Sequence, residues 1–135
     1  MCDARRVEDE NEGDRLQRGR EAYAGQFGID ESDVPTWFAE RFGERFGREA
    51  INAAGGAWTD DVLSLRDRSL IVVASLASQG GLDDRLRGHV RWALAHGSNR
   101  AELEALVTLL AVYAGFPKAA AAMEIVRDEL ERLGV

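Results

Sequence analysis

Residues 66–78 read RDRSLIVVASLAS, and this apolar run decides the fold class. At about 100° per residue, its apolar side chains lie almost all round a helix, which is typical of a helix buried in a core. Ser64 supplies a start signal just before the run, and Gly80-Gly81 supplies a stop signal just after it. The run therefore predicts a central α-helix, the most buried element of the chain.

Helical spacing extends from this run toward both ends of the chain. Phe38, Phe42 and Phe46 recur every four residues after Pro35, and they predict an aromatic ridge on one helix. Gly55-Gly56 is expected to break the chain after that helix. Other helices are expected at about residues 15–27, 83–96 and 99–114, and from residue 117 onward. Because no stretch alternates with period two, we predict an all-α fold of about six helices.

The length of 135 residues suits one domain with a real core. Residues 1–14 are charged and almost without large apolar side chains, so we expect a flexible acidic tail there. The helical domain is expected to cover residues 15–135.

The charge and the cysteine content exclude several classes of function. With a net charge of -7, the surface would repel nucleic acid and anionic membranes, so neither partner is expected. No window approaches the roughly 20 apolar residues of a membrane span, and no signal-like stretch begins the chain, so we expect a cytoplasmic location. Cys2 is the single cysteine, which excludes an internal disulfide and a C-x-x-C motif.

The predicted helix at residues 83–96 carries the most informative side chains. Arg85, His89, Trp92 and His96 fall along one line, at spacings of four, three and four. One interpretation is that His89 is simply a packed, hydrogen-bonded residue at the border of the core. The same place also suits a general acid or base, because a half-buried imidazole titrates near neutrality. A metal site is not expected, because two histidines seven residues apart have no carboxylate on that line.

Two arginines open the central helix. A solvated first turn is one account of Arg66 and Arg68. A helix N-terminus prefers negative charge, however, so at least one of them is expected to meet an anion or a buried carboxylate. Trp58 and Tyr113 are candidates for the walls of an apolar pocket, with core packing as the alternative for both.

Several short motifs, in this order, make the chain resemble the carboxymuconolactone decarboxylase family. The more specific ones are H-V-R-x-A-L-x-x-G at residues 89–97 and A-V-Y-A-G-x-P at residues 111–117. They are accompanied by Trp58-Thr59, Arg68-Ser69-Leu70 and Glu102-Leu103, and the spacing holds over about residues 20–133. The resemblance implies an AhpD-like helical fold in a ring-like homo-oligomer, a trimer or more commonly a hexamer.

The resemblance also implies one of two activities. One branch of the family comprises cofactor-free decarboxylases that convert 4-carboxymuconolactone to β-ketoadipate enol-lactone in aromatic catabolism. The other comprises alkylhydroperoxidase-like disulfide reductases with a C-x-x-C-x-x-x-H motif. Aligning that motif on His89 places its cysteines at Leu82 and Arg85, and neither side chain forms a disulfide. Peroxide reduction by that mechanism is therefore excluded.

We therefore expect a decarboxylase that needs no cofactor and acts on a small carboxylic acid or lactone. Arg68 and Arg85 are expected to hold the anionic substrate, and His89 to be the acid/base. The remaining substrate-binding residues are expected to be Trp58, Arg66, Trp92, His96 and Tyr113. The chain departs from many decarboxylases at Arg85, Ala105 and Leu109. These departures motivate the alternative, a non-catalytic scaffold that binds a small ligand or mediates assembly.

Overall fold

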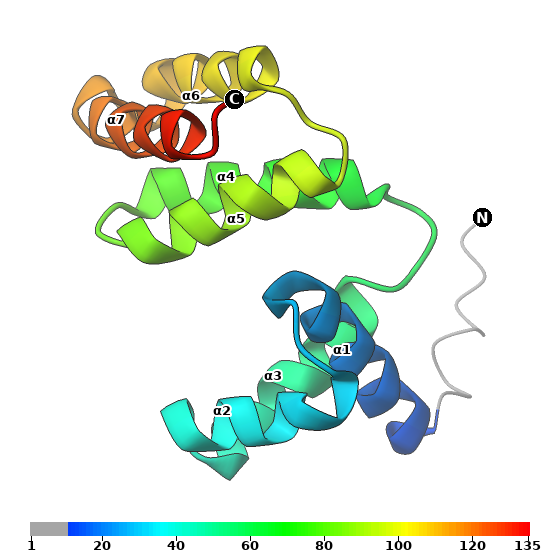
Figure 1. Ribbon diagram of the computed structural model, residues 1–135. Coiled ribbons are helices and arrows are strands. Elements are labelled where there is room, and N and C mark those ends of the chain that lie inside the picture. Colours follow the sequence, from blue (N-terminus) through cyan, green and yellow to red (C-terminus); the bar gives the residue numbers. More distant parts are fainter. Residues whose placement is uncertain (1–10) are drawn as a thin grey trace. The chain divides into compact units, whose positions relative to one another are not determined.

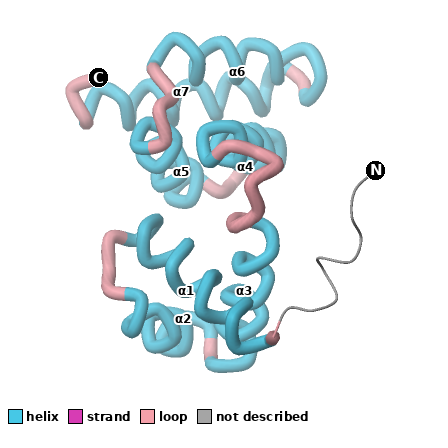
Figure 2. The backbone as a smooth tube through the Cα atoms, turned by 90° about the vertical axis from the view of Figure 1, so that its right-hand side faces the viewer, coloured by secondary structure: helices cyan, strands magenta, loops and turns pink. Residues whose placement is uncertain are grey.

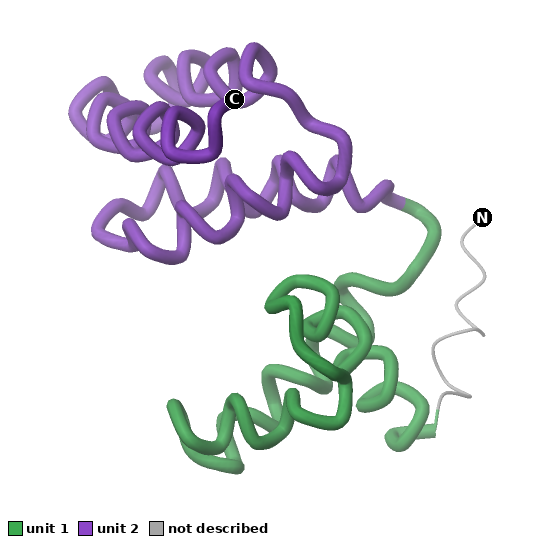
Figure 3. Tube along the Cα trace, viewed as in Figure 1, with its two compact units in different colours: residues 1–62 green, residues 63–135 purple. Residues whose placement is uncertain are grey.

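The computed structural model describes residues 11–135, and every regular element in this range is helical (Figure 1, Figure 2). The predicted all-α fold is therefore confirmed. Residues 1–10, which include Cys2 and most of the predicted tail, lie outside the described residues. The chain divides into two compact units, with the boundary between Val62 and Leu63 (Figure 3).

The first unit contains α1 (Glu12–Phe27), the 3-10 helix η2 (Glu31–Asp33), α2 (Val34–Phe42) and α3 (Glu44–Ala57). The second unit contains α4 (Leu65–Gln79), α5 (Asp83–Ala95), α6 (Arg100–Ala114) and α7 (Phe116–Arg132). None of these helices is long and apolar enough to cross a membrane.

The first helix begins earlier than the sequence suggested. We predicted a start at Arg15 after a flexible tail that reached residue 14, but α1 starts at Glu12. The Asn11 side chain accepts a hydrogen bond from the Gly13 N–H at 2.9 Å and so caps the helix. The helix therefore begins three residues before the predicted start.

Glycines in the first unit have two different functions. Gly43, with φ of 86°, ends α2 and separates it from α3, so the predicted single helix is two and the described residues hold seven α-helices. Gly55-Gly56, by contrast, does not break the chain but lies inside α3. A Cβ on Gly55 would lie 2.0 Å from the Arg15 carbonyl oxygen. The missing side chain therefore lets α1 and α3 pack closely.

Aromatic rings fill the rest of the first unit. Phe38 is buried, with Tyr23 4.8 Å and Trp37 5.0 Å from it, between ring centroids. The rings of Phe38 and Phe42 are 6.0 Å apart, and those of Phe42 and Phe46 are 5.1 Å apart. The predicted aromatic ridge is confirmed, although it spans two helices.

The second unit is a two-layer helical bundle, in which α4 and α5 form one pair and α6 and α7 form the other (Figure 1, Figure 2). Arg100 at the start of α6 donates to the Val135 carbonyl at 2.8 Å, so α6 and α7 run antiparallel. The central helix α4 packs against α5, α6 and α7. It is not buried all round, because Ile71 is exposed within the chain. The core comprises Val73, Ala77, Leu86, Val90, Ala93, Leu103, Val107, Ala111, Ala119, Ala122, Val126 and Leu130.

Candidate functional site

The predicted line of side chains is present on α5. The rings of His89 and Trp92 lie 5.9 Å apart in an edge-on arrangement, and those of Trp92 and His96 lie 4.6 Å apart. The Trp92 ring is buried, whereas both imidazoles are half-buried and Arg85 is exposed. Because one indole contacts both imidazoles, the three rings form a continuous edge along the helix.

A serine of α4 contacts His96, the last of these three rings. The Ser69 hydroxyl oxygen lies 2.7 Å from Nδ1 of His96, and Ser69 is completely buried. We did not predict Ser69, although it sits inside the Arg68-Ser69-Leu70 motif. Nothing in the local sequence shows that the first turns of α4 face the end of α5.

Burial lowers the pKa of both imidazoles. Burial first, and then the nearby charge of Arg85, lowers the pKa of His89 from 6.5 to about 4. Burial also lowers the pKa of His96, while a backbone hydrogen bond with Leu65 acts in the opposite direction. In the free site, burial thus favours the neutral form of both imidazoles, and His89 lies near the cation of Arg85.

Protein stability is expected to depend on pH through His89. Its folded pKa lies below its unfolded pKa of about 6.5, so this contribution is fully present above pH 6.5 and is lost as pH falls toward 4. We expect a loss of roughly 1–3 kcal/mol, allowing for solvent that reaches the ring. Urea unfolding of the wild type and of His89→Gln at pH 7.5 and pH 4.5 measures it. Equal losses in the two proteins would contradict the assignment.

The two arginines at the start of α4 differ in their surroundings. Arg66 forms ion pairs with Glu102 on α6 and with Asp67, the latter at 3.4 Å. Arg68 is buried and donates to the Leu63 carbonyl at 2.7 Å. Arg66 therefore meets two carboxylates, but neither of them is buried.

The two predicted wall residues lie in different units. Trp58 is the half-buried C-cap residue of α3. Tyr113 lies on α6 with 83% of its surface exposed, so the alternative of core packing fails for Tyr113 within the chain.

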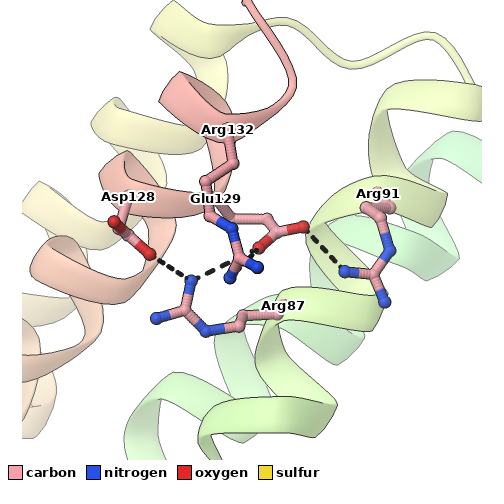
Figure 4. Close-up of polar contacts among 5 residues, drawn as sticks. All are labelled: Arg87, Arg91, Asp128, Glu129 and Arg132. Carbon is pink, nitrogen blue, oxygen red and sulfur yellow. Dashed lines mark hydrogen bonds and ion pairs between the residues drawn. The ribbon is translucent and has the colours of Figure 1, made fainter.

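An ion-pair cluster around the buried Glu129, which the sequence did not suggest, joins α5 to α7 (Figure 4). The Glu129 side chain is 5% exposed, and its oxygens lie 2.7 Å from Arg91, 3.3 Å from Arg87 and 3.7 Å from Arg132. Arg87 also contacts Asp128 at 2.5 Å. Burial alone would raise the pKa of Glu129, but the arginines outweigh it and lower that pKa.

This cluster is separate from the edge of rings. Arg87 and Arg91 lie two positions before and after His89, so they project from the opposite side of α5. The cluster therefore anchors α5 against α7. The side of α5 that carries His89 takes no part in that contact.

A small apolar pocket of about 230 Å³ lies where α4 ends and where α5 and α7 begin. Leu82 and Leu86 line it, together with the charged residues Asp83 and Lys118, and no predicted site residue is among its lining residues. Within residues 11–135, no group of three or more His, Cys, Asp or Glu side chains is placed to hold a metal ion.

Comparison with known proteins gives two matches. The sequence model described as "Carboxymuconolactone decarboxylase family" matches residues 45–128, from α3 to α7. A 4-carboxymuconolactone decarboxylase of Acinetobacter baylyi (strain ATCC 33305 / BD413 / ADP1) is 34% identical over 83 residues. These cover 62% of this chain and 61% of that relative. The match to the family model includes Arg68, Arg85, His89, Trp92 and His96.

Proposed function

Because this chain belongs to the carboxymuconolactone decarboxylase family, we propose that it is a cofactor-free decarboxylase of a small carboxylated lactone. The observation that supports this most is the half-buried imidazole of His89, next to the indole of Trp92 and the charge of Arg85. The similar protein from Acinetobacter baylyi carries that activity in its name.

The proposed reaction requires three contributions from the protein: a cation that orients the substrate, an apolar wall and a proton donor. The bond between the ring carbon and the carboxylate breaks, carbon dioxide leaves, and the electron pair moves into the conjugated lactone carbonyl as an enolate. A cation must orient the anionic substrate, and we assign this to Arg85 and Arg68. An apolar wall favours the loss of charge from the carboxylate, and Trp92 supplies it. A proton must then reach the carbon next to the lactone carbonyl, and we assign its delivery to His89.

The low pKa of His89 fits this order of events. In the free protein the ring is neutral, because burial and Arg85 disfavour its charged form. A bound carboxylate offsets the charge of Arg85 and favours protonation of the imidazole. His89 thus becomes a proton donor only when substrate is present.

Carbon dioxide release from 4-carboxymuconolactone tests this proposal. The purified protein is expected to release it catalytically without added metal or cofactor. Arg85→Gln is expected to raise KM, because it removes a cation that orients the substrate. An unchanged KM in this variant would contradict the role of Arg85.

The small apolar pocket favours a second candidate, a non-catalytic scaffold that binds a small ligand. Its lining contains none of the residues assigned to the reaction. Such a scaffold would bind a small carboxylic acid tightly and release no carbon dioxide, so the same assay separates the two candidates.

We further propose that the protein is a homo-oligomer, a trimer or hexamer, that buries one face of α6. Three large apolar side chains share this face at helical spacing, and the exposed Phe116 begins α7 just after it. Leu109 is 61% exposed, Val112 72%, Tyr113 83% and Phe116 73%. A second copy of the chain is the partner that would remove this surface from water.

Introducing a charge on this face is expected to dissociate the oligomer. A glutamate at Val112→Glu would have to be buried without a partner, which is costly. Light scattering after size-exclusion chromatography should then give the monomer mass, whereas the control Ala53→Glu, at an exposed position of α3, should keep the wild-type mass. An unchanged mass of Val112→Glu would exclude this face as the interface.

A further inference from the structure

The small pocket of the second unit is lined by apolar side chains and by two opposite charges. It lies where the end of α4 meets the starts of α5 and α7, at one end of the bundle (Figure 1), and its volume is about 230 Å³. Leu76, Leu82, Leu86 and Ile125 contribute the larger apolar side chains. A cavity of roughly 150 Å³ with such a lining holds benzene. The pocket therefore has room for an aromatic ring that carries one small substituent.

Lys118 is an unusual cation for this chain, and it lines the pocket. It is the single lysine among 17 basic residues. It lies in the first turn of α7, where the helix dipole disfavours positive charge. Arg66 and Arg100 also lie in first turns, but both pair with carboxylates, Arg100 with Glu104 at 3.1 Å. Among the residues that the structure describes, Lys118 forms no ion pair, so its charge is not balanced there.

The second charge at the pocket, that of Asp83, is accounted for by its own helix. Asp83 is the first residue of α5, where the helix dipole favours a carboxylate. Asp83 and Lys118 both line the pocket but do not pair with each other. Of the two charges, the positive one is therefore the one that a ligand would have to balance.

We propose that this pocket binds a small apolar monocarboxylic acid, with its apolar part among the leucines and its carboxylate at the ammonium of Lys118. A hydrogen bond from lysine to a carboxylate is stronger than one to a neutral group, so the acid binds more tightly than an uncharged molecule of the same shape. Asp83 repels the carboxylate and limits its affinity. The inference rests on the scaffold candidate, whose ligand class it names, and it does not require the release of carbon dioxide.

Titration with benzoate and with benzyl alcohol, its uncharged counterpart, tests the proposal. Nuclear magnetic resonance follows the amide signals of the purified protein at pH 7.5. Both molecules are expected to shift the signals of Gly80 and Gly81, which line the pocket. Benzoate is expected to bind about tenfold more tightly, which is the contribution of one hydrogen bond to a charged group in partly exposed surroundings. Equal affinities, or shifts centred on His89 and Trp92 instead, would overturn the proposal.

Removing single charges tests which of them holds the carboxylate. Lys118→Gln is expected to abolish the preference for benzoate and to leave the binding of benzyl alcohol unchanged. The control Arg127→Gln removes a positive charge from an exposed position of the same helix, away from the pocket lining, and should keep the preference. Asp83→Asn should strengthen benzoate binding roughly threefold, because a repulsion partly screened by salt is lost. A preference that survives Lys118→Gln would contradict the assignment.

Filling the pocket tests its location. Ala121 lines the pocket from an exposed position of α7, so the ring of Ala121→Phe should exclude both molecules. Binding that persists in this variant would place the site elsewhere. If the wild type binds neither molecule and Ala121→Phe lowers the molecular mass, a second copy fills the pocket and the proposal fails. Because these titrations use no lactone, a failure to release carbon dioxide counts only against the decarboxylase, and a failure to bind benzoate counts only against this inference.

Discussion

His89→Gln is expected to lower kcat by about 10²- to 10⁴-fold, the usual contribution of a positioned acid or base. Glutamine keeps a polar group beside Trp92 but neither gains nor loses a proton near neutral pH. The loss should appear in kcat more than in KM, because proton delivery follows substrate binding. The far-ultraviolet circular dichroism spectrum and the molecular mass should stay those of the wild type.

Two controls separate a chemical role of His89 from a structural one. His96→Gln changes the other imidazole that contacts Trp92, and it is expected to act mainly on KM. The pKa of His89 in Arg85→Gln should rise above about 4 but stay below 6.5, because burial, the larger cause of the shift, persists. Wild-type kcat in His89→Gln would remove His89 from the reaction.

Glu129→Gln is expected to cost about 2–3 kcal/mol of unfolding free energy, because three arginines lose the buried carboxylate that they share. The estimate is below the usual cost of breaking a fully buried pair, because Arg91 and Arg132 are more than half exposed and water screens their charge. Urea unfolding followed by circular dichroism measures the difference. The control Glu124→Gln, at an exposed position of the same helix, should change stability by less than about 0.5 kcal/mol.

The pH dependence gives a second check on Glu129. Its pKa is lowered in the folded protein, so its stabilising contribution is present above the ordinary carboxyl range and is lost as pH falls through the folded pKa. The stability difference between the wild type and Glu129→Gln should therefore shrink below about pH 4.5. This window lies below that of His89, which is lost between pH 6.5 and 4. A difference that stays constant at low pH would show that the charge of Glu129 is not what stabilises the fold.

The sequence predicts those features that depend on residues close to one another in the chain. At the start of α6, Asn99 and Glu102 form the expected capping box, because both partners belong to one turn. The line from Arg85 to His96 follows from helical periodicity in the same way. The structural role of a glycine is ambiguous in the sequence. Gly43 ends α2, whereas Gly55 lies inside a helix and permits close packing.

Contacts between distant helices carry no such local signal. Ser69 and His96 are 27 residues apart, and Arg91 and Glu129 are 38 residues apart. Each pair exists only because the helices stack in one particular way. This is why the positioning of His96 and the anchor of α5 could not be predicted from the sequence, whereas the edge of rings could.

The central claim is that this protein releases a carboxylate as carbon dioxide and delivers a proton to the enolate that remains. The most direct measurement uses 4-carboxymuconolactone labelled with ¹³C at the carboxyl group, incubated with the protein in deuterated buffer and followed by nuclear magnetic resonance. We expect one equivalent of labelled carbon dioxide for each lactone consumed, and one deuterium at the carbon of the product that receives the proton. Line broadening of a lactone that keeps its labelled carboxylate would show binding without decarboxylation, and it would contradict the account.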